Sequence, residues 1–556
     1  MTLREILPPF EWIGTYKRDY VRGDLIGGVT LAVMLVPQAM AYAMLAGLPP
    51  VMGLYAATVP LIIYALFGSS RHLSVGPVAV ISLLVAGACG KLAQPGSVDY
   101  REMVLLLALM VGIIQVLLGS FRMGFLFNFI SHAVISGFTS AAAIIIICSQ
   151  IKNMLGITIT GDTVISILVE TTQHAGSANV LTLGISAASI VTLLFFKKKM
   201  PLFPAPLLVV VAGTLAVYSL GLGAMGVRTV GTVPAGIPPL SLPAFRFEII
   251  NALFPAALVI FFVGFMESIA VAKMVAVKRG YMIDADQELR GLGAANMASA
   301  FFSGYPVTGG FSRTAINHEA GTQTGLASVM TGVLVLLTLL FLTPLFTHLP
   351  NAVLASVIVV AVSGLITPRD AIEFFKVKKS DGWTWVLTFA ATLILGPEHG
   401  ILIGFLFSLA VFIARSAYPH CAELGYIETW DVFRNVARYP DAATFPRTLI
   451  MRIDGPLYFA NIKFIEERLH EAVLQKEDLQ WIVIDCADVY DIDGVAVHSL
   501  DMIMREYADQ QIGVVLTGVI GPVRDLLKRA GWDRKYGDHI AFFSIKQALT
   551  SLNISD

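Results

Sequence analysis

Residues 305–317 read "YPVTGGFSRTAIN" and place a single arginine, Arg313, directly after two glycines, a phenylalanine and a serine. The flanking sequence is apolar, with "MASAFF" before it and "LASVMTGVLVLLTLLFL" after it. An arginine at the centre of a membrane helix costs about 2.5–3.5 kcal/mol on insertion scales. Arg313 therefore needs a compensating partner, and a bound anion, a nearby carboxylate or a water-filled vestibule would each provide one.

The composition of the chain is that of an integral membrane protein. Of its 556 residues, 56% are hydrophobic and 14% are charged, whereas a typical soluble domain is about 25% charged. The longer hydrophobic segments can cross a hydrocarbon core about 30 Å thick, so we expect the lipid bilayer to surround them. The net charge of −1 gives no reason to expect nucleic-acid binding. The hydrophobic segments, about fourteen in number, are approximately 25–45, 51–68, 76–90, 103–120, 133–151, 180–196, 206–222, 250–277, 287–303, 311–320, 325–347, 351–365, 383–396 and 398–416.

Basic residues predict the orientation of these segments. Lys and Arg cluster at 17–22, before the first segment, and again in alternate connections at 197–199, 278–279 and 376–379. Both termini are therefore predicted to be cytoplasmic, at the plasma or inner membrane of the cell.

After Tyr418 the pattern changes to short buried strands, within 447–461, 478–493 and 511–519, and amphipathic helices, within 461–477 and 521–531. This alternation predicts a small soluble α/β domain. The predicted division is a transmembrane transport domain at 1–418 and a cytoplasmic domain at 430–556.

Two of the hydrophobic segments are short and open with glycine and small residues. They begin "SVGPVAVISLL" (74–84) and "GGFSRTAI" (309–316), and they are the third of the first seven segments and the third of the second seven. Paired broken segments at matching places in two halves point to the midplane binding site of a transporter. A half-helix presents free N–H groups and the positive end of its dipole, so two facing ends predict an anion site.

The first hydrophobic segment carries polar groups that suit such a site. In "LVPQAMAYAMLAGLPP" (35–50), Gln38 and Tyr42 are four residues apart and share one helix face. An amide donor and an aromatic wall would fit an oxyanion. The alternative is a packing helix kinked at Pro37, in which Gln38 binds a neighbouring carbonyl.

The eighth segment holds one carboxylate, Glu267, deep in apolar sequence. Burial favours the protonated form of a carboxyl group, and an ionisable residue inside a membrane is a functional candidate. One role is proton coupling, in which the ionised form pairs with Arg313. The alternative is a permanent structural salt bridge with Arg313 or another base.

No enzyme motif is present. The chain lacks GxxxxGK[ST] and GxSxG, and "NHEAG" (317–321) lacks the second histidine of a zinc helix. We expect no catalytic residues, no metal and no cofactor.

Long stretches of the chain resemble the SulP anion transporters, which include sulfate permeases. The resemblance runs through "PQAMAYAMLAGLPPVMGLYAATVPLIIYALFGSSRHLSVGPVAVISLL" (37–84), "FMESIAVAK" (265–273), "DADQELRGLGAANMASAFFSGYPVTGGFSRTAINHEAGTQTG" (284–325) and "RIDGPLYFANIKFIEERL" (452–469). It is closest to the plant-type proton-coupled sulfate symporters. It implies two inverted repeats of seven spans, a core domain that moves against a gate domain, a C-terminal STAS domain and a homodimer.

The resemblance also implies an anion site between the N-termini of spans three and ten, beside spans one and eight. Glu267 matches the position linked to cation coupling in symporting members. The implied substrate-binding residues are Gln38, Tyr42, Val75, Gly76, Pro77, Val78, Ala79, Phe311, Ser312 and Arg313.

The STAS region departs from the related sigma-factor antagonists at one turn. Those proteins carry a phosphorylatable serine there, whereas "YDIDGVAVHSL" (490–500) has Asp493 followed by Gly494 and Val495. A phosphorylation switch at this turn is therefore not expected.

These observations predict a secondary active transporter that imports sulfate or a similar oxyanion with protons by an elevator-like movement. One alternative keeps the fold and changes the substrate to bicarbonate, chloride or a dicarboxylate, moved by sodium symport or exchange. A second alternative is a membrane-tethered regulatory protein that signals through its STAS domain.

Overall fold

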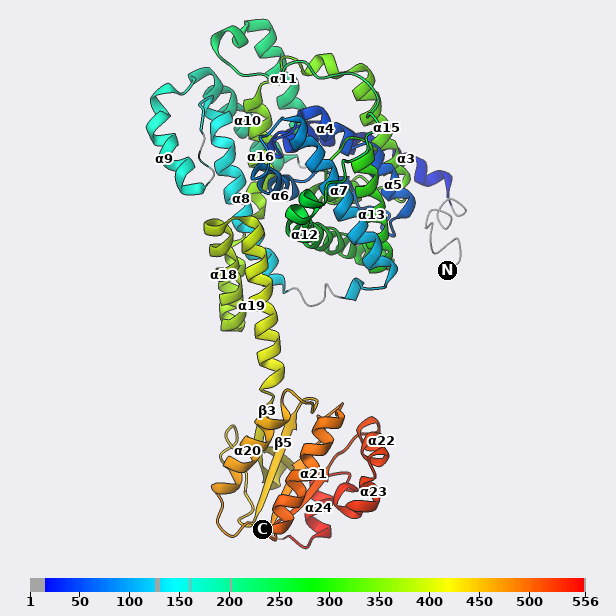
Figure 1. Cartoon of the computed structure of the whole chain (residues 1–556), viewed down its shortest axis with the longest axis vertical. Helices are drawn as coiled ribbons and strands as arrows, with labels where there is room; N and C mark the ends of the chain where they lie inside the picture. Colours follow the sequence, from blue (N-terminus) through cyan, green and yellow to red (C-terminus); the bar gives the residue numbers. More distant parts are fainter. Residues whose placement is uncertain (1–15, 126–130, 160, 162, 201–202, 555–556) are drawn as a thin grey trace. The chain divides into compact units, whose positions relative to one another are not determined.

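A computed structural model describes residues 16–125, 131–159, 161, 163–200 and 203–554. The chain separates into two compact units, Met1–Ser408 and Leu409–Asp556. The first unit is built mainly of helices, and the second contains a β-sheet (Figure 1). This sheet has five strands. The predicted boundaries at 418 and 430 stay predictions.

All the predicted hydrophobic segments coincide with helices or broken helices of the structure. Among the described residues, eight helical stretches are long and apolar enough to cross a membrane by length and composition, and α6, α11 and α15 are shorter apolar helices. The first half contains α3 (Arg18–Leu45), α4 (Pro50–Ala56), α5 (Val59–Phe67), α6 (Ala79–Gly90), α7 (Val98–Ser120), α8 (His132–Leu155), α9 (Val164–His174), α10 (Val180–Lys199) and α11 (Ala205–Leu220). The second half contains α12 (Phe247–Arg279), α13 (Ala285–Phe301), α14 (Phe311–Glu319), α15 (Leu326–Phe341), α16 (Asn351–Val362), α17 (Pro368–Val377), α18 (Lys379–Leu395) and α19 (Pro397–Ala417).

The helices of the first unit pack in two groups. In one group, α13 packs against α5 and α7, α12 against α6 and α7, and both α14 and α15 against α3. In the other, α8 packs against α16 and α18, and α10 packs against α11 and α16. The groups meet where α3 contacts α11 and α16 and where α6 contacts α8. This division matches the core and gate domains of the expected fold, and both short helices, α6 and α14, lie in the first group.

The two broken segments are confirmed, and a short strand precedes each. Strands β1 (Val75–Gly76) and β2 (Thr308–Gly309) pair antiparallel, with Val75 opposite Gly309 and Gly76 opposite Thr308. Hydrogen bonding between the two strands satisfies some of the non-helical peptide groups that are buried in protein here. The pairing brings the helices that follow, α6 and α14, to the same place.

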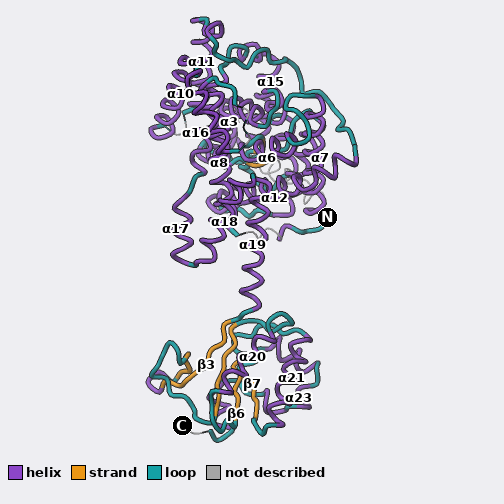
Figure 2. The backbone as a smooth tube through the Cα atoms, turned by 60° about the vertical axis from the view of Figure 1, so that its left-hand side comes forward, coloured by secondary structure: helices purple, strands orange, loops and turns teal. Residues whose placement is uncertain are grey.

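The second unit is an α/β domain with a mixed sheet in the order β4-β3-β5-β6-β7. Figure 2 shows these strands in orange with helices beside them. Strand β3 pairs antiparallel with β4 and β5, while β5, β6 and β7 run parallel. The strands are β3 (His420–Ile427), β4 (Val432–Asn435), β5 (Thr448–Asp454), β6 (Trp481–Asp485) and β7 (Gly513–Thr517).

Alternate strand residues enter separate cores on the two faces of this sheet, as the period of two requires. Leu449, Ile482 and Leu516 pack with residues of α20, α21 and α22, whereas Ile450 and Val483 pack with residues of α24. The three strands and two helices predicted for this domain are confirmed as β5, β6, β7, α20 and α22, whereas β3, β4, α21, α23 and α24 are not predicted from the sequence. The helices are α20 (Ile462–Leu474), α21 (Gly494–Asp509), α22 (Gly521–Arg529), α23 (Trp532–Lys535) and α24 (Ile545–Ser551).

The turn without a serine has a structural role. Asp493 caps α21, since its carboxylate accepts hydrogen bonds from the backbone N–H groups of Ala496, at 2.8 Å, and Phe459, at 2.9 Å. The turn residue therefore joins the start of α21 to the loop after β5.

Candidate functional site

The N-termini of the two half-helices lie together and are open. Val78 precedes α6 and Gly310 precedes α14; both have extended backbones, and no described side chain caps either helix. The backbone N–H of Gly310 donates to the carbonyl of Ser74 at 3.0 Å, which extends the β1–β2 pairing up to the start of α14. The first N–H groups of a helix have no partner inside it, so both ends can donate to a ligand.

Arg313 lies in the first turn of α14 and is only 2% exposed. Its Nη1 atom donates to the carbonyl of Pro77 at 2.8 Å, which joins the second repeat to the first. In the described part of the chain, its Nε and Nη2 atoms have no hydrogen-bond partner. A buried donor without a partner costs about 1–3 kcal/mol, and more when it is charged. The two free donors therefore favour a ligand that supplies acceptors.

Two glycines lie next to this guanidinium group. A Cβ atom on Gly310 would lie 2.7 Å from Cζ of Arg313, so any side chain at this position would displace the guanidinium group. A Cβ atom on Gly76 would lie 3.6 Å from Nη2, which places that free donor beside strand β1.

Tyr42 and Glu267 border the same region. Gln38 and Tyr42 are buried on α3, which contains Pro37 as predicted. Tyr42 interacts electrostatically with both Arg313 and Glu267. Glu267, on α12, is partly buried and also interacts electrostatically with Arg313. Among the described residues, however, no ion pair within 4.0 Å joins Glu267 to Arg313, so the alternative of a permanent contact salt bridge between them is not what the structure contains.

The remaining predicted residues are placed as follows. Val75 and Gly76 form β1, Pro77 accepts from Arg313, and Val78 and Ala79 lie at the cap and first position of α6. Phe311 and Ser312, at the start of α14, are exposed. The structure thus gathers the residues from spans one, three, eight and ten in one group of helices.

Several buried polar residues of this region were missed by the sequence analysis. Tyr305 is fully buried and interacts electrostatically with Tyr42 and Arg313. Beside Glu267, the hydroxyl of Ser268 accepts from the backbone N–H of Gly309 at 2.8 Å and contacts the hydroxyl of Thr308 at 2.6 Å. Ser268 directly follows Glu267 in the sequence, and this adjacency is the signal by which Ser268 could have been identified as part of the site.

Two fully buried carboxylates fix the loops that precede β1 and follow α14. Glu288 accepts from the hydroxyl of Tyr64 at 2.7 Å and from the backbone N–H groups of Ser69 and Ser70, each at 2.8 Å. Asp24 accepts from the backbone N–H of Gln323 at 2.8 Å and the hydroxyl of Thr324 at 2.6 Å. His72 and Asn317 then join the two loops, because His72 Nε2 lies 3.0 Å from the carbonyl of Thr322 and Asn317 donates to the carbonyl of His72 at 2.8 Å.

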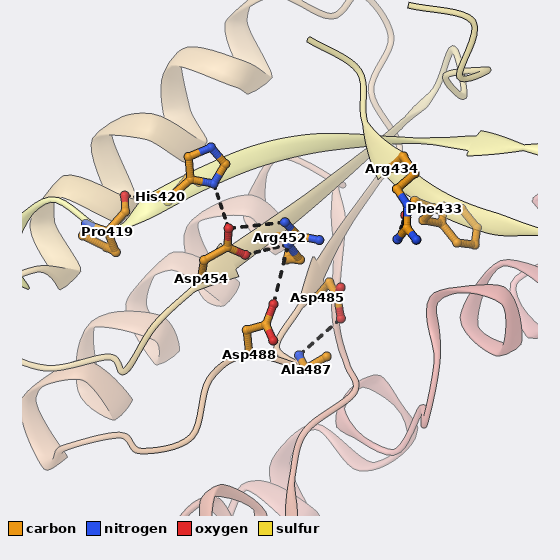
Figure 3. Close-up of polar contacts among 10 residues, drawn as sticks. Pro419, His420, Phe433, Arg434, Arg452, Asp454, Asp485, Ala487 and Asp488 are labelled. Atoms are coloured by element: carbon orange, nitrogen blue, oxygen red, sulfur yellow. Dashed lines mark hydrogen bonds and ion pairs between the residues drawn. The ribbon is translucent and has the colours of Figure 1, made fainter. Parts of the chain in front are cut away.

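A second polar cluster lies at the carboxyl end of β5 in the second unit (Figure 3). Asp454 accepts from Arg452 Nε at 2.6 Å and contacts His420 Nδ1 at 2.7 Å, while Asp488 lies 3.7 Å from Arg452 Nε. Partial burial alone would raise the pKa of the Asp454 carboxyl, but the hydrogen bonds from Arg452 and His420 outweigh burial and hold that pKa below its usual range.

Comparison with known families and proteins gives strong matches. The profile of the sulfate permease family matches residues 21–388, and that of the STAS domain matches residues 439–546. Sulfate transporter 4.1, chloroplastic, from Arabidopsis thaliana is 39% identical over 564 residues, which cover 98% of this chain and 82% of that protein. Sulfate transporter 1.1 from the same plant is 33% identical over 573 residues, which cover 98% and 88% of the two chains.

Solved structures resemble all or most of the chain. A structure of SLC26A9 superposes with a TM-score of 0.91 at 25% identity and covers 99% of this chain and 93% of that one. Murine Slc26a9, described as an anion transporter in the inward-facing state, gives a TM-score of 0.92 at 25% identity, with 99% and 94% of the chains covered. The transmembrane domain of the cyanobacterial bicarbonate transporter BicA shares the fold, with a TM-score of 0.62 at 24% identity over 71% of this chain and 98% of that domain.

Proposed function

The chain belongs to the sulfate permease family, and from this premise we propose that it is a secondary active transporter that imports sulfate or a similar oxyanion together with protons. The relatives at 31–39% identity are named as sulfate transporters, which supports the substrate. The family consists of transporters rather than enzymes.

The buried guanidinium group of Arg313 is the observation that carries this proposal. Two of its donors have no partner among the described residues, and they lie beside two uncapped half-helix ends. A fixed positive charge, free backbone N–H groups and positive dipole ends all favour an anion. The proposed substrate-binding residues are those expected from the sequence: Gln38, Tyr42, Val75, Gly76, Pro77, Val78, Ala79, Phe311, Ser312 and Arg313.

Proton coupling is proposed at Glu267. Import of a dianion against a negative-inside potential costs about 4.6 kcal/mol per 100 mV, twice the single-charge value, so uptake needs a driving ion. Glu267 lies close enough to Arg313 to interact with it electrostatically, although the two side chains form no contact salt bridge. A bound anion and a proton would then each change the electrostatic balance at the other group, which couples their binding.

The proposed movement is elevator-like. The half-helices and Glu267 lie in one packed group of helices, and a second group borders it at α3 and α6. Movement of the first group past the second would carry the site across the membrane without remodelling it. We further propose that the protein forms a homodimer in the plasma or inner membrane. The STAS domain would lie on the cytoplasmic side, as in the family, and would support the assembly of this dimer.

Radiolabelled sulfate uptake into proteoliposomes tests this function. With an inward proton gradient the wild type should accumulate sulfate, and the accumulation should collapse when the gradient is abolished. Uptake of bicarbonate or chloride with no sulfate uptake would overturn the substrate. Gradient-independent exchange would overturn the coupling, and absence of any anion flux in a folded preparation would overturn the transporter itself.

A further inference from the structure

Each half-helix carries a hydroxyl group at the same position, four residues after the residue that directly precedes the helix. In α6 this residue is Ser82, whose Oγ donates to the carbonyl of Val78 at 2.9 Å. In α14 it is Thr314, whose Oγ1 donates to the carbonyl of Gly310 at 2.8 Å. Both side chains are fully buried. The equivalence places one such hydroxyl in the first turn of each half-helix.

Each hydroxyl also accepts a hydrogen bond from the opposite repeat. Ser82 Oγ lies 3.1 Å from the hydroxyl of Tyr305, and Tyr305 is the donor because the single proton of Ser82 is used on Val78. Thr314 Oγ1 accepts from the backbone N–H of Ser74 at 3.1 Å. The segment leading to β2 therefore holds α6, and the segment leading to β1 holds α14.

These contacts fix the first turns through their carbonyl groups and leave their N–H groups free. An ordinary N-cap serine or aspartate holds a helix end by accepting from the N–H groups of the first turn. In the described chain, Val78 and Gly310 provide no such acceptor. A hydroxyl that donates to the carbonyl four residues earlier uses none of the N–H donors that an anion needs. Its second bond, from the opposite repeat, holds the turn in place.

We propose that Ser82, Thr314 and Tyr305 are positioning residues, which hold the two half-helix ends at a fixed separation so that both donate to one anion. None of the three is proposed to touch the anion. They act through the N–H groups of the turns that they brace, as preorganised donors do. The inference rests on the proposed function, since it concerns the affinity of the same site.

The test compares hydroxyl-deleting with hydroxyl-retaining variants of the full-length protein in sulfate uptake. Ser82→Ala and Thr314→Val each remove the bond from the opposite repeat and should raise the KM for sulfate at least about fivefold, the factor that corresponds to the ~1 kcal/mol of one hydrogen bond. The maximal rate per folded protein should not change. Ser82→Thr and Thr314→Ser keep the hydroxyl and should restore the KM.

Tyr305→Phe is a milder variant, because it removes one hydroxyl without leaving a cavity. It should raise the KM, and the double variant should be no worse than Ser82→Ala alone, because Ser82→Ala already removes the contact with Tyr305. The control is Thr388→Val on α18, where a buried threonine makes the same kind of bond, to Thr384 at 2.7 Å, far from the broken helices in sequence. Its KM should equal that of the wild type.

The outcomes separate this inference from the function on which it rests. If the wild type transports sulfate and Tyr305→Phe, Ser82→Ala and Thr314→Val all keep its KM, the positioning role is overturned. A raised KM that Ser82→Thr and Thr314→Ser fail to reverse would also overturn it, because the hydroxyl would then be irrelevant. If the wild type moves no anion at all, the proposed function fails and this inference falls with it.

Discussion

Tyr64 on α5 donates a hydrogen bond of 2.7 Å to Glu288 on α13, and both side chains are buried. The same carboxylate accepts from Ser69 and Ser70, in the loop that leads to β1. The hydrogen bonds thereby join Ser69 to Glu288, which lies 219 positions later in the sequence. The path of the chain into the first half-helix thus depends on a carboxylate in the other repeat.

Replacement of Glu288 by alanine should destabilise the protein strongly. The change leaves the hydroxyl of Tyr64 and the N–H groups of Ser69 and Ser70 without an acceptor, and a lost hydrogen bond to a charged group costs about 1.5–3 kcal/mol. We expect the free energy of unfolding to fall by at least about 3 kcal/mol, measured by thermal unfolding of the purified protein. Glu373→Ala, an exposed carboxylate on α17, serves as the control. Equal stability of the two variants would contradict the structural role of Glu288.

Arg313 should be needed for transport, and lysine should replace it only in part. Arg313→Ala removes the buried charge and should abolish sulfate uptake. Arg313→Lys keeps the charge but loses the planar set of donors that binds both Pro77 and a ligand. Its KM should rise at least about tenfold, the factor for the loss of one charge-assisted hydrogen bond. Arg228→Ala, at an exposed arginine, is the control, and normal uptake by Arg313→Ala would exclude the anion site.

Much of this site is predictable from sequence because its signals are local. The glycines and small residues before Arg313 mark a helix that starts at mid-membrane, and the matching position of 74–84 marks its partner. Gln38 and Tyr42 share a face because they are one helical turn apart. Periodicity and composition therefore identify the spans and most of the proposed ligands.

The contacts that hold the site together are not predictable in this way. The hydrogen bond from Tyr305 to Ser82 joins residues 223 positions apart, and the pairing of Val75 with Gly309 crosses between the repeats. Neither leaves a periodic pattern, because each depends on how the two halves pack. Helix α21 is not predicted for a different reason: the turn at Asp493, which precedes its start at Gly494, is interpreted from the sequence only as a departure from a phosphorylation site.

Glu267→Gln should separate transport from coupling. The amide is close in shape to the carboxylate but cannot exchange a proton, so proton-driven accumulation of sulfate should be lost. Sulfate–sulfate exchange should persist, because the anion site itself is intact. Glu248→Gln on the same helix, at an exposed position, should behave as the wild type. Accumulation by Glu267→Gln that still follows the proton gradient would show that the coupling group lies elsewhere.

Acid should weaken the second unit through Asp454. Because the pKa of this carboxyl is lowered in the folded protein, by Arg452 and His420 against the opposing effect of burial, the ionised form is favoured by folding. Its contribution to stability is therefore present in full above the unfolded-state pKa of about 3.9. This contribution to stability is lost as the pH falls through the lower pKa that Asp454 has in the folded protein.

The variant Asp454→Asn isolates this contribution, since it retains the shape and cannot ionise. The stability of the wild type should exceed that of the variant at neutral pH, and the difference should shrink as the pH falls from about 5 toward 2. The measurement is denaturant unfolding of the full chain across that range. Asp478→Asn is a matched control at an exposed aspartate for which the described residues provide no ion pair. A difference that stays constant across the pH range would mean that Asp454 acts through its shape and hydrogen bonds rather than through its charge.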